Sequence, residues 1–497
     1  MRLNKSWLAA AAAMAMATGG CNLVSGSEGS APAGVTAEAI QGAAQDAEVR
    51  RFYEARQWQP AWDQQRGDQL VETLRGAVRH GLNSATLLRD VEGAGSPVER
   101  EVALTKAALA YAGTLAHGAT NPTRLSTVYE IPRNQVDVAR GLAQAVQGNN
   151  VGQWIEAQAP QDEEYRALSN AYVQLVQAQQ QQQQPQTGAA QQNVQGNAQA
   201  EGNSQASGNA QADGNAQGER RARDDERRAQ ASDLPADERA VILAVNMERR
   251  RWLERQPPNT RIDVNTAAAF LRYFRDGNLA DRRVVVVGEP GWETPQLGSP
   301  IFRLVANPTW TVPDSIEQDE LANLSAAQLA RKNMKREDGR LVQQPGPQNA
   351  LGLVKFDMQN DHAIYLHDTP AKQMFGRDDR HLSHGCVRVQ DALGFARLLA
   401  QHEGKLEQFE RAQRGNSQSG GELEPTFINL DRRIPVRLLY HTAFVDNGQV
   451  MFAPDAYGWD AAVAEGLGLR APGASSQALE RARQKRAQRQ RGADYGP

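Results

Sequence analysis

A polar, low-complexity stretch divides this chain and sets the main limit on how it can fold. Residues 178–232 consist mostly of Gln, Asn, Ala and Gly and include six consecutive glutamines at 179–184. They show no hydrophobic periodicity, and so few apolar side chains cannot bury enough surface to offset the loss of chain entropy. The stretch is predicted to be a disordered linker, with self-association through the polar tract as the alternative. The 497 residues then form an α+β multidomain chain, with cores on both sides of the linker.

The charge balance limits the kinds of partner. Lys and Arg number 55 and Asp and Glu 58, a formal charge of -3, which excludes a broad basic surface for nucleic acid. Only the end of the chain, residues 466–497, has a strongly basic cluster. We expect a solvated basic helix or tail there, with contact to anionic lipid or acidic polymers as the alternative. The clustered residues are Arg481, Arg483, Lys485, Arg486, Arg489 and Arg491.

The N-terminus has the pattern of an export signal. Basic residues precede an apolar run, Trp7–Ala17, which is about half the length needed to cross a bilayer. Residues 1–21 are therefore predicted to be a signal peptide. The small residues before Cys21 resemble a lipobox, in which the cysteine is acylated and becomes the mature N-terminus.

The expected product is a lipid-anchored periplasmic protein with a tether at 22–40. Asn22, in place of aspartate, favours the outer membrane over the inner one. A competing cleavage site at Ala15-Met16-Ala17 would instead give an untethered exported protein.

Residues 41–177 are predicted to be a helical scaffold domain. Apolar residues recur at helical spacing, as at Leu70 and Leu74. Glycine or proline separates the segments and predicts helix ends. The expected breaks are Gly81, Gly118 and Asn121-Pro122.

Residues 233–465 change to a strand pattern after one helix that begins near Asp233. Asp276-Gly277-Asn278 is a natural hairpin turn, and a helix is expected after Asp391. Residues 314–340 are predicted to be a polar helical insertion, and such insertions commonly serve as lids. The predicted strands are 262–264, 270–274, 284–287, 301–305, 353–356, 363–366 and 436–440.

The surroundings of Cys386 favour nucleophilic chemistry. A thiol becomes reactive when a neighbouring imidazole favours the thiolate. His367 is the candidate base, and Asp368 or its backbone carbonyl would fix the tautomer of the ring. Gly385 leaves space for a substrate, and backbone N–H groups at Gly385 and Cys386 suit an oxyanion. Arg388 would bind a carboxylate or order the loop.

Four of the eight histidines lie close to Cys386 in the sequence. Such residues also ligate zinc, but a glycine beside the cysteine and an arginine beyond it suit an anion-handling nucleophile better. We therefore predict no metal and no cofactor. His362 and His381 are expected to face solvent or to order loops. The four histidines are His362, His367, His381 and His384.

The string Ser383-His-Gly-Cys-Val-Arg388, with His367 nineteen residues before the cysteine, resembles the signature of L,D-transpeptidases. These are YkuD-type enzymes that remodel bacterial peptidoglycan. Longer motifs over residues 234–460 are similar, in the same order, to the large periplasmic branch typified by the YcbB enzyme. The helical region is similar to the scaffold of that branch. The longer motifs include Val245–Arg249, Asn307–Pro313, Pro345–Gly352, Val354–Phe356 and Tyr365–Pro370.

The resemblance implies a β-rich catalytic domain that transfers an acyl group through a Cys386 thioester, with His367 as base. The donor would be a tetrapeptide stem that loses its terminal D-alanine, and a diaminopimelate amine would accept the acyl group in a 3-3 cross-link. The 314–340 insertion would cap the substrate, and carbapenems would acylate the thiol. Residues implied to shape the site are Ser383, His384, Gly385 and Arg388, with Asp368 and Tyr365 beside them.

Members of this branch usually carry a peptidoglycan-binding module where this chain has its Gln-rich stretch. A lipid tether at Cys21 would compensate by keeping the enzyme close to its polymer. Two other functions stay open. The thioester can be resolved by water or by another amine, giving L,D-carboxypeptidase activity, D-amino-acid exchange or protein anchoring. The long helical region and the linker also fit a non-catalytic scaffold lipoprotein.

Overall fold

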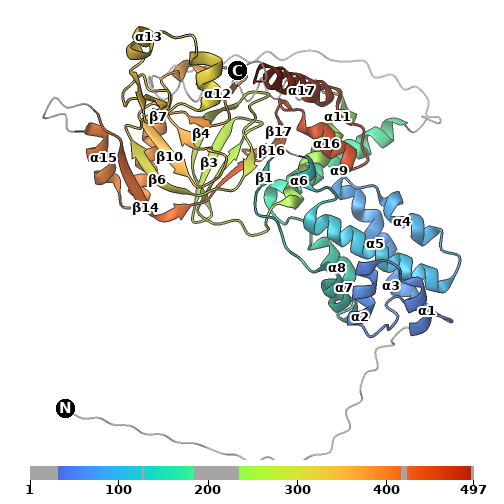
Figure 1. Ribbon diagram of the computed structural model, residues 1–497. Helices are drawn as coiled ribbons and strands as arrows, with labels where there is room; N and C mark the ends of the chain where they lie inside the picture. Colours follow the sequence, from blue (N-terminus) through green and yellow to red (C-terminus); the bar gives the residue numbers. More distant parts are fainter. Residues whose placement is uncertain (1–31, 126–127, 184–233, 416–422, 494–497) are drawn as a thin grey trace, which may run out of the picture.

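The computed structural model describes residues 32–125, 128–183, 234–415 and 423–493. The first part of the chain forms a helical region and the last part a β-rich region (Figure 1). The predicted signal peptide, Cys21 and most of the predicted linker lie outside these residues. Among the helices described, none has both the length and the apolar character needed to cross a membrane.

One long helix organises the helical region. Helix α5 (Pro97–His117) is capped at its start by the hydroxyl of Ser96 and at its end by Gly118, where φ is +88°. Tyr111 and Leu115 are fully buried among the neighbouring helices. The prediction of a helical scaffold is confirmed. The other elements are α1 (Ala37–Ala43), α2 (Ala47–Ala55), α3 (Gln64–Arg75), η1 (Gly76–His80), α4 (Ser84–Glu92), α6 (Pro122–Leu125), β1 (Tyr129–Glu130), α7 (Val138–Gln147), α8 (Val151–Glu156) and α9 (Glu163–Gln183).

Two predicted boundaries move. Helix α1 begins within the stretch predicted as a tether, because Thr36 caps it and Ile40 is fully buried. Helix α9 continues to Gln183, into the predicted linker, since glutamine has a good helix propensity.

A mixed sheet forms the centre of the β-rich region, in the order β14-β6-β10-β11-β13-β4-β3-β2-β15, with β12 beside β4. Helices α14 (Ala392–His402) and α15 (Leu406–Arg414) cover one face and bury Phe395 and Phe409 against it. The predicted β-rich domain is confirmed. The strands are β2 (Arg261–Asn265), β3 (Phe270–Arg275), β4 (Asn278–Gly288), β6 (Ile301–Ala306), β10 (Val354–Met358), β11 (Leu366–His367), β12 (His381–Ser383), β13 (Val387–Val389), β14 (Thr426–Ile434) and β15 (Val436–Leu439).

Turn chemistry explains where these strands begin and end. Asp276 and Gly277 have φ of 50° and 85° and join β3 to β4, as the sequence predicts. The strand predicted at 363–366 starts later, because Ala363 has φ of 53° and cannot continue an extended backbone.

The insertion predicted to be helical over 314–340 is helical only in its first half. Helical turns α12 (Asp314–Ile316), η2 (Glu317–Leu321) and α13 (Ala326–Arg331) lead into a hairpin. Its second strand also pairs with β7, which makes a separate three-stranded sheet in the order β7-β9-β8. The prediction is wrong for this half, because Asp338-Gly339 forms a hairpin turn with φ of 48° and 82°. The hairpin strands are β8 (Met334–Glu337) and β9 (Arg340–Gln343), and β7 is Trp310–Thr311.

Helix α11 (Ala236–Trp252) joins the helical and β-rich regions. Leu243 and Met247 belong to the core of the helical region, whereas Val245 and Trp252 pack in a cluster that includes Leu439 of β15. Glu248, fully buried on this helix, pairs with Arg251 at 2.7 Å. The helix therefore lies in two apolar cores at once.

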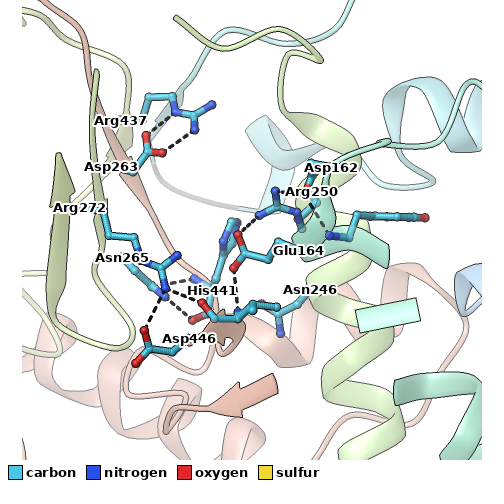
Figure 2. A network of polar contacts seen from close by, with 12 residues as sticks. Asp162, Glu164, Asn246, Arg250, Asp263, Asn265, Arg272, Arg437, His441 and Asp446 are labelled. Carbon is cyan, nitrogen blue, oxygen red and sulfur yellow. Dashed lines mark hydrogen bonds and ion pairs between the residues drawn. The ribbon is translucent and has the colours of Figure 1, made fainter. Parts of the chain in front are cut away.

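A polar network crosses the same boundary (Figure 2). Arg250 of α11 binds Asp162 at 2.6 Å and Glu164 at 2.9 Å, and Glu164 accepts the Val445 N–H at 3.0 Å. Arg250 stands near the end of α11 and Glu164 at the start of α9. The end of α11 therefore lies beside the start of α9. Since the two helices also pack against each other, they run antiparallel, and the later turns of α9 lie on the side of the beginning of α11.

The basic C-terminal residues form a docked helix. In α17 (Gly473–Ala493), Ala478 and Ala482 are buried. Arg486 of this helix pairs with Glu293 at 3.0 Å. A Cβ at Gly458, just before α16 (Trp459–Gly466), would overlap the backbone of Leu479. The expected basic helix forms, and Arg481, Arg483 and Lys485 are exposed on it. It is docked and not a free tail, because small residues on its other side allow close packing.

Candidate active site

Side-chain alternation on neighbouring strands creates the candidate site. Val354, Leu366 and Val387, one on each of β10, β11 and β13, are fully buried in the core beneath α14. The residues next to each of them along its strand therefore point to the opposite face of the sheet. That face is the floor of a cavity of about 770 Å³, which the 314–340 insertion covers with Ile316 and Leu321. The predicted residues that line it are Tyr365, His367, Ser383, His384, Cys386 and Arg388.

Cys386, immediately before β13, is half-buried in this cavity. Its Sγ lies 3.6 Å from the carbonyl oxygen of Ala363, and the Tyr365 hydroxyl interacts with it. Burial raises the pKa of the thiol, although the charges of Lys355 and Arg388 act in the opposite direction. The resting group is therefore the thiol, unlike the thiolate that the sequence favoured, because burial outweighs the cations.

His367 lies on the same face as Cys386. Strand β11 pairs in parallel with β13, which places His367 opposite Arg388 and makes Cys386 a diagonal neighbour. The Nδ1–H donates to the carbonyl oxygen of Asp368 at 2.5 Å, and a carbonyl can only accept, so Nε2 is the unprotonated nitrogen. Burial and the Arg388 guanidinium lower the pKa of His367 to about 3. The ring is thus a neutral base beside a neutral thiol.

Ser383 fixes the shape of the loop that carries the cysteine. Its hydroxyl donates to the Cys386 carbonyl oxygen at 2.6 Å and accepts the Gly385 N–H at 3.2 Å. Gly385 has φ of +109°, a conformation that favours glycine. Because the Gly385 N–H is used within the loop, the Cys386 N–H remains the oxyanion candidate of the predicted pair.

A second loop supports the first from outside. Thr294 Oγ1 donates to the Gly385 carbonyl oxygen at 2.8 Å. The ring of Trp292 stands edge-on to His384, with centroids 5.3 Å apart, and Trp292 also lines the cavity. Arg486 of α17 holds Glu293 in the same loop. The docked C-terminal helix is therefore connected to one wall of the cavity.

The carboxylate of Asp368 does not orient His367. It accepts a hydrogen bond from the Leu353 N–H at 3.0 Å and forms an ion pair with Lys372. A Cβ at Gly352 would overlap it, so glycine is required there. Of the two sequence alternatives, the backbone carbonyl holds the imidazole, and the carboxylate holds the loop before β10.

The remaining histidines have other positions. His362 lies at the rim of the cavity and pairs with Glu130 of β1 at 2.8 Å, so the helical region reaches the site. His381 is buried, 2.8 Å from Asp379 and 3.1 Å from the Thr266 carbonyl oxygen, and orders its loop. Across the described residues, no group of three His, Cys, Asp or Glu is arranged to bind a metal.

Sequence reasoning missed three charged residues on the cavity floor, Arg303, Lys355 and Asp357. Lys355 was included only in a motif of the resemblance. The signal that places it is the alternation Val354-Lys-Phe-Asp, with apolar side chains to the core and charges to the other face.

Two families match the chain. A scaffold domain matches residues 47–171, and an L,D-transpeptidase catalytic domain, YkuD, matches residues 259–405. A Haemophilus influenzae protein to which L,D-transpeptidase activity is provisionally assigned is 31% identical over 241 residues. The match covers 44% of this chain and 48% of that relative, so the chain spans about half the length of the relative.

Two solved structures are also similar. An L,D-transpeptidase described as an avibactam carbamoyl enzyme has 15% identity and a TM-score of 0.18, over 28% of this chain and 44% of its own. A mutant of the Enterococcus faecium L,D-transpeptidase has 12% identity and a TM-score of 0.19, over 29% and 47%. At these TM-scores neither likeness carries weight. The family matches do: residues 259–405 are a YkuD-family L,D-transpeptidase catalytic domain, and residues 47–171 are the scaffold domain that precedes it.

Proposed function

We propose that this protein is a peptidoglycan L,D-transpeptidase that works through a covalent thioester. The observation that carries the proposal is a thiol and a neutral, buried imidazole on one face of the sheet, in a covered cavity of a domain of that family. Arg388 stands opposite His367 and stabilises the neutral form of the ring. The Cys386 N–H would donate to the oxyanion.

The reaction would have two halves. Cys386 Sγ attacks the carbonyl after the L-centre of diaminopimelate in a tetrapeptide stem, while its proton passes to His367 Nε2. The tetrahedral intermediate collapses to a thioester, and the same proton leaves with the amine of D-alanine. A diaminopimelate amine of a second stem then attacks the thioester, releases the thiol and completes a 3-3 cross-link.

Mass spectrometry of the products tests this reaction. Purified protein incubated with disaccharide tetrapeptides should release D-alanine and form 3-3 dimers, and Cys386→Ala should form none. His367→Gln should lower kcat about 10²- to 10⁴-fold, the usual contribution of a general base, whereas His402→Gln, outside the cavity, is the matched control. Tripeptides without dimers would indicate water as the acceptor. Stems left intact by the wild type would leave the scaffold lipoprotein as the better assignment.

The same nucleophile should react with carbapenems. Acylation by the ring-opened drug would add its full mass to the peptide that contains Cys386, and Cys386→Ala would remain unmodified. An adduct on any other residue would contradict the assignment of the nucleophile.

We also propose a lipid anchor at Cys21 in the periplasm, with the outer membrane favoured. Metabolic labelling with an alkyne fatty acid should mark the wild type and not Cys21→Ser. A label that persists in the variant would leave the untethered exported form.

A further inference from the structure

The floor of the cavity carries a charged row that the proposed reaction does not use. Asp357 on β10 lies between two cations, with Arg303 Nε of β6 at 2.5 Å and Lys355 Nζ at 2.7 Å. The Asp357 side chain is buried, with 7% exposed, and Lys355 keeps 25% of its side chain exposed. One carboxylate cannot neutralise two cations, so the row presents net positive charge to the cavity.

Lys355 is fixed relative to the nucleophile. The register of β10 and β11 places it directly opposite His367. Its Nζ stands 4.2 Å from the ring centroid of Tyr365, a cation over an aromatic face. The hydroxyl of that ring interacts with Cys386. The side chain of Tyr365 therefore contacts the ammonium group through its ring face and the sulfur through its hydroxyl.

The other cation near the sulfur is placed differently. Arg388 lies opposite His367 on β13, the neighbour of β11 on the side away from β10, and its Nη1 contacts Met374 Sδ at 2.9 Å. Its charge disfavours protonation of His367. Arg388 thus suits the task of keeping the base neutral. Lys355 also lines the cavity, and it lies at the face of the Tyr365 ring, whose hydroxyl interacts with the sulfur.

The donor of the proposed reaction supplies a matching anion. In a tetrapeptide stem, only the amide nitrogen and one α-carbon separate the attacked carbonyl carbon from the terminal carboxylate. We propose that Lys355, held by Asp357 and by the face of Tyr365, binds this terminal carboxylate and selects stems that end one residue after the scissile bond. A longer stem presents an uncharged amide at the same position. This inference rests on the proposed function and adds a basis for its choice of donor.

Donors that differ by one charge test the inference. The wild type should form the Cys386 thioester from a free-acid tetrapeptide with a kcat/KM about 10- to 100-fold higher than from the C-terminal amide, the usual effect of a hydrogen bond to a charged group. The difference should lie mainly in KM. A third donor, amidated on the diaminopimelate side-chain carboxylate instead, should react like the free acid. If the donor amidated on the diaminopimelate side chain is the one that reacts slowly, the enzyme recognises that carboxylate and not the terminal one, and the inference fails.

Variants then assign the preference to Lys355. Lys355→Met should bring the ratio of the two kcat/KM values close to one, and Lys355→Arg should keep most of it. Lys335→Met is the matched control, since Lys335 is exposed on the hairpin and pairs with Glu337. Melting curves and alkylation of Cys386 show whether each variant is folded. A preference that survives in folded Lys355→Met, or is missing from the wild type, would overturn the inference. Failure of every donor to acylate Cys386 would instead reject the proposed function.

Discussion

The thiol of Cys386 and the imidazole of His367 are both neutral in the substrate-free protein, because both are withdrawn from water. A preformed thiolate–imidazolium pair is therefore absent from this state. In the proposed reaction the proton would move as the carbonyl carbon is attacked. Until then the thiol would react more slowly with alkylating agents than a thiolate.

The pKa of His367 predicts an unusual dependence on pH. Since burial lowers it from 6.5 to about 3, the ring stays unprotonated as the pH falls, and the acid limb of kcat/KM should lie well below pH 6.5. The unfolded chain binds this proton first, so stability is lost as the pH falls from 6.5 towards 3. By pH 5 the loss should be about 2 kcal/mol.

Chemical denaturation at pH 7 and pH 5 measures this loss. The difference between the two pH values should shrink most in His367→Gln. It should shrink much less in His402→Gln, because burial also lowers the pKa of His402 but that ring is only half-buried. An acid limb near pH 6.5, which His367→Gln removes, would contradict the pKa argument.

At this scale the sequence predicts only side chains that belong to a fixed motif. Cys386, Ser383 and Arg388 were found because one short string contains them, and His367 because of its spacing. The structure brings them to one cavity, while their roles stay predictions. Lys355 and Asp357 carry no such motif, since their place depends on which strands pair with β10 and in which register.

The elements show where sequence patterns suffice. Helix α5 follows from the recurrence of its apolar residues, and the end of β4 follows from the continuous apolar run Val284–Val287. The first part of β4, which is polar, carries no such signal. The hairpin of the insertion and the docking of α17 do not, because their apolar contacts are few. Only the Asp338-Gly339 turn and the alanines at 478 and 482 indicated them.

Helix α17 should depend on one glycine. In Gly458→Ala the new Cβ would overlap the backbone of Leu479, at a φ of +71° that glycine favours. The strain should cost about 1–3 kcal/mol, and overpacking adds to it. Thermal unfolding should show the lower stability, and proteolysis should cleave α17 earlier than in the wild type.

Gly448→Ala is the matched control, because it has a similar φ of +74° with nothing within 4 Å. It should show the backbone cost alone and leave α17 protected. Equal proteolysis of the two variants would mean that close packing at Gly458 does not hold the helix.

At the scale of the whole molecule, the scaffold and catalytic regions share their interior. The buried Glu248 accepts the Thr120 N–H at 2.7 Å and pairs with Arg251, so it links α11 to the helical region. Glu130 meets His362 at the rim of the cavity. The sequence predicts two regions. It does not predict that they pack together, because nothing in the sequence shows that the apolar residues of α11 are divided between two cores.

The antiparallel contact of α9 and α11 predicts tolerance of changes between them. Replacing residues 184–233 with a short Gly-Ser segment joins neighbouring helix ends, and loop closure should change stability by only about 1 kcal/mol. Thermal unfolding should remain a single transition, with turnover of soluble muropeptides unchanged. Glu248→Ala is the contrasting variant. It leaves the buried charge of Arg251 without its carboxylate and should lower the free energy of unfolding by about 3–5 kcal/mol. Two separate transitions after shortening would show that the connection itself holds the regions together.

Because α9 and α11 pack together, the segment between them is also a suitable place for the insertion or loss of a domain. A whole module can enter or leave the chain there during evolution without moving a residue of either core, because the two helices already meet. Differences in the modules that related proteins carry can therefore arise at one point in the gene while the cavity of the β-rich region stays the same.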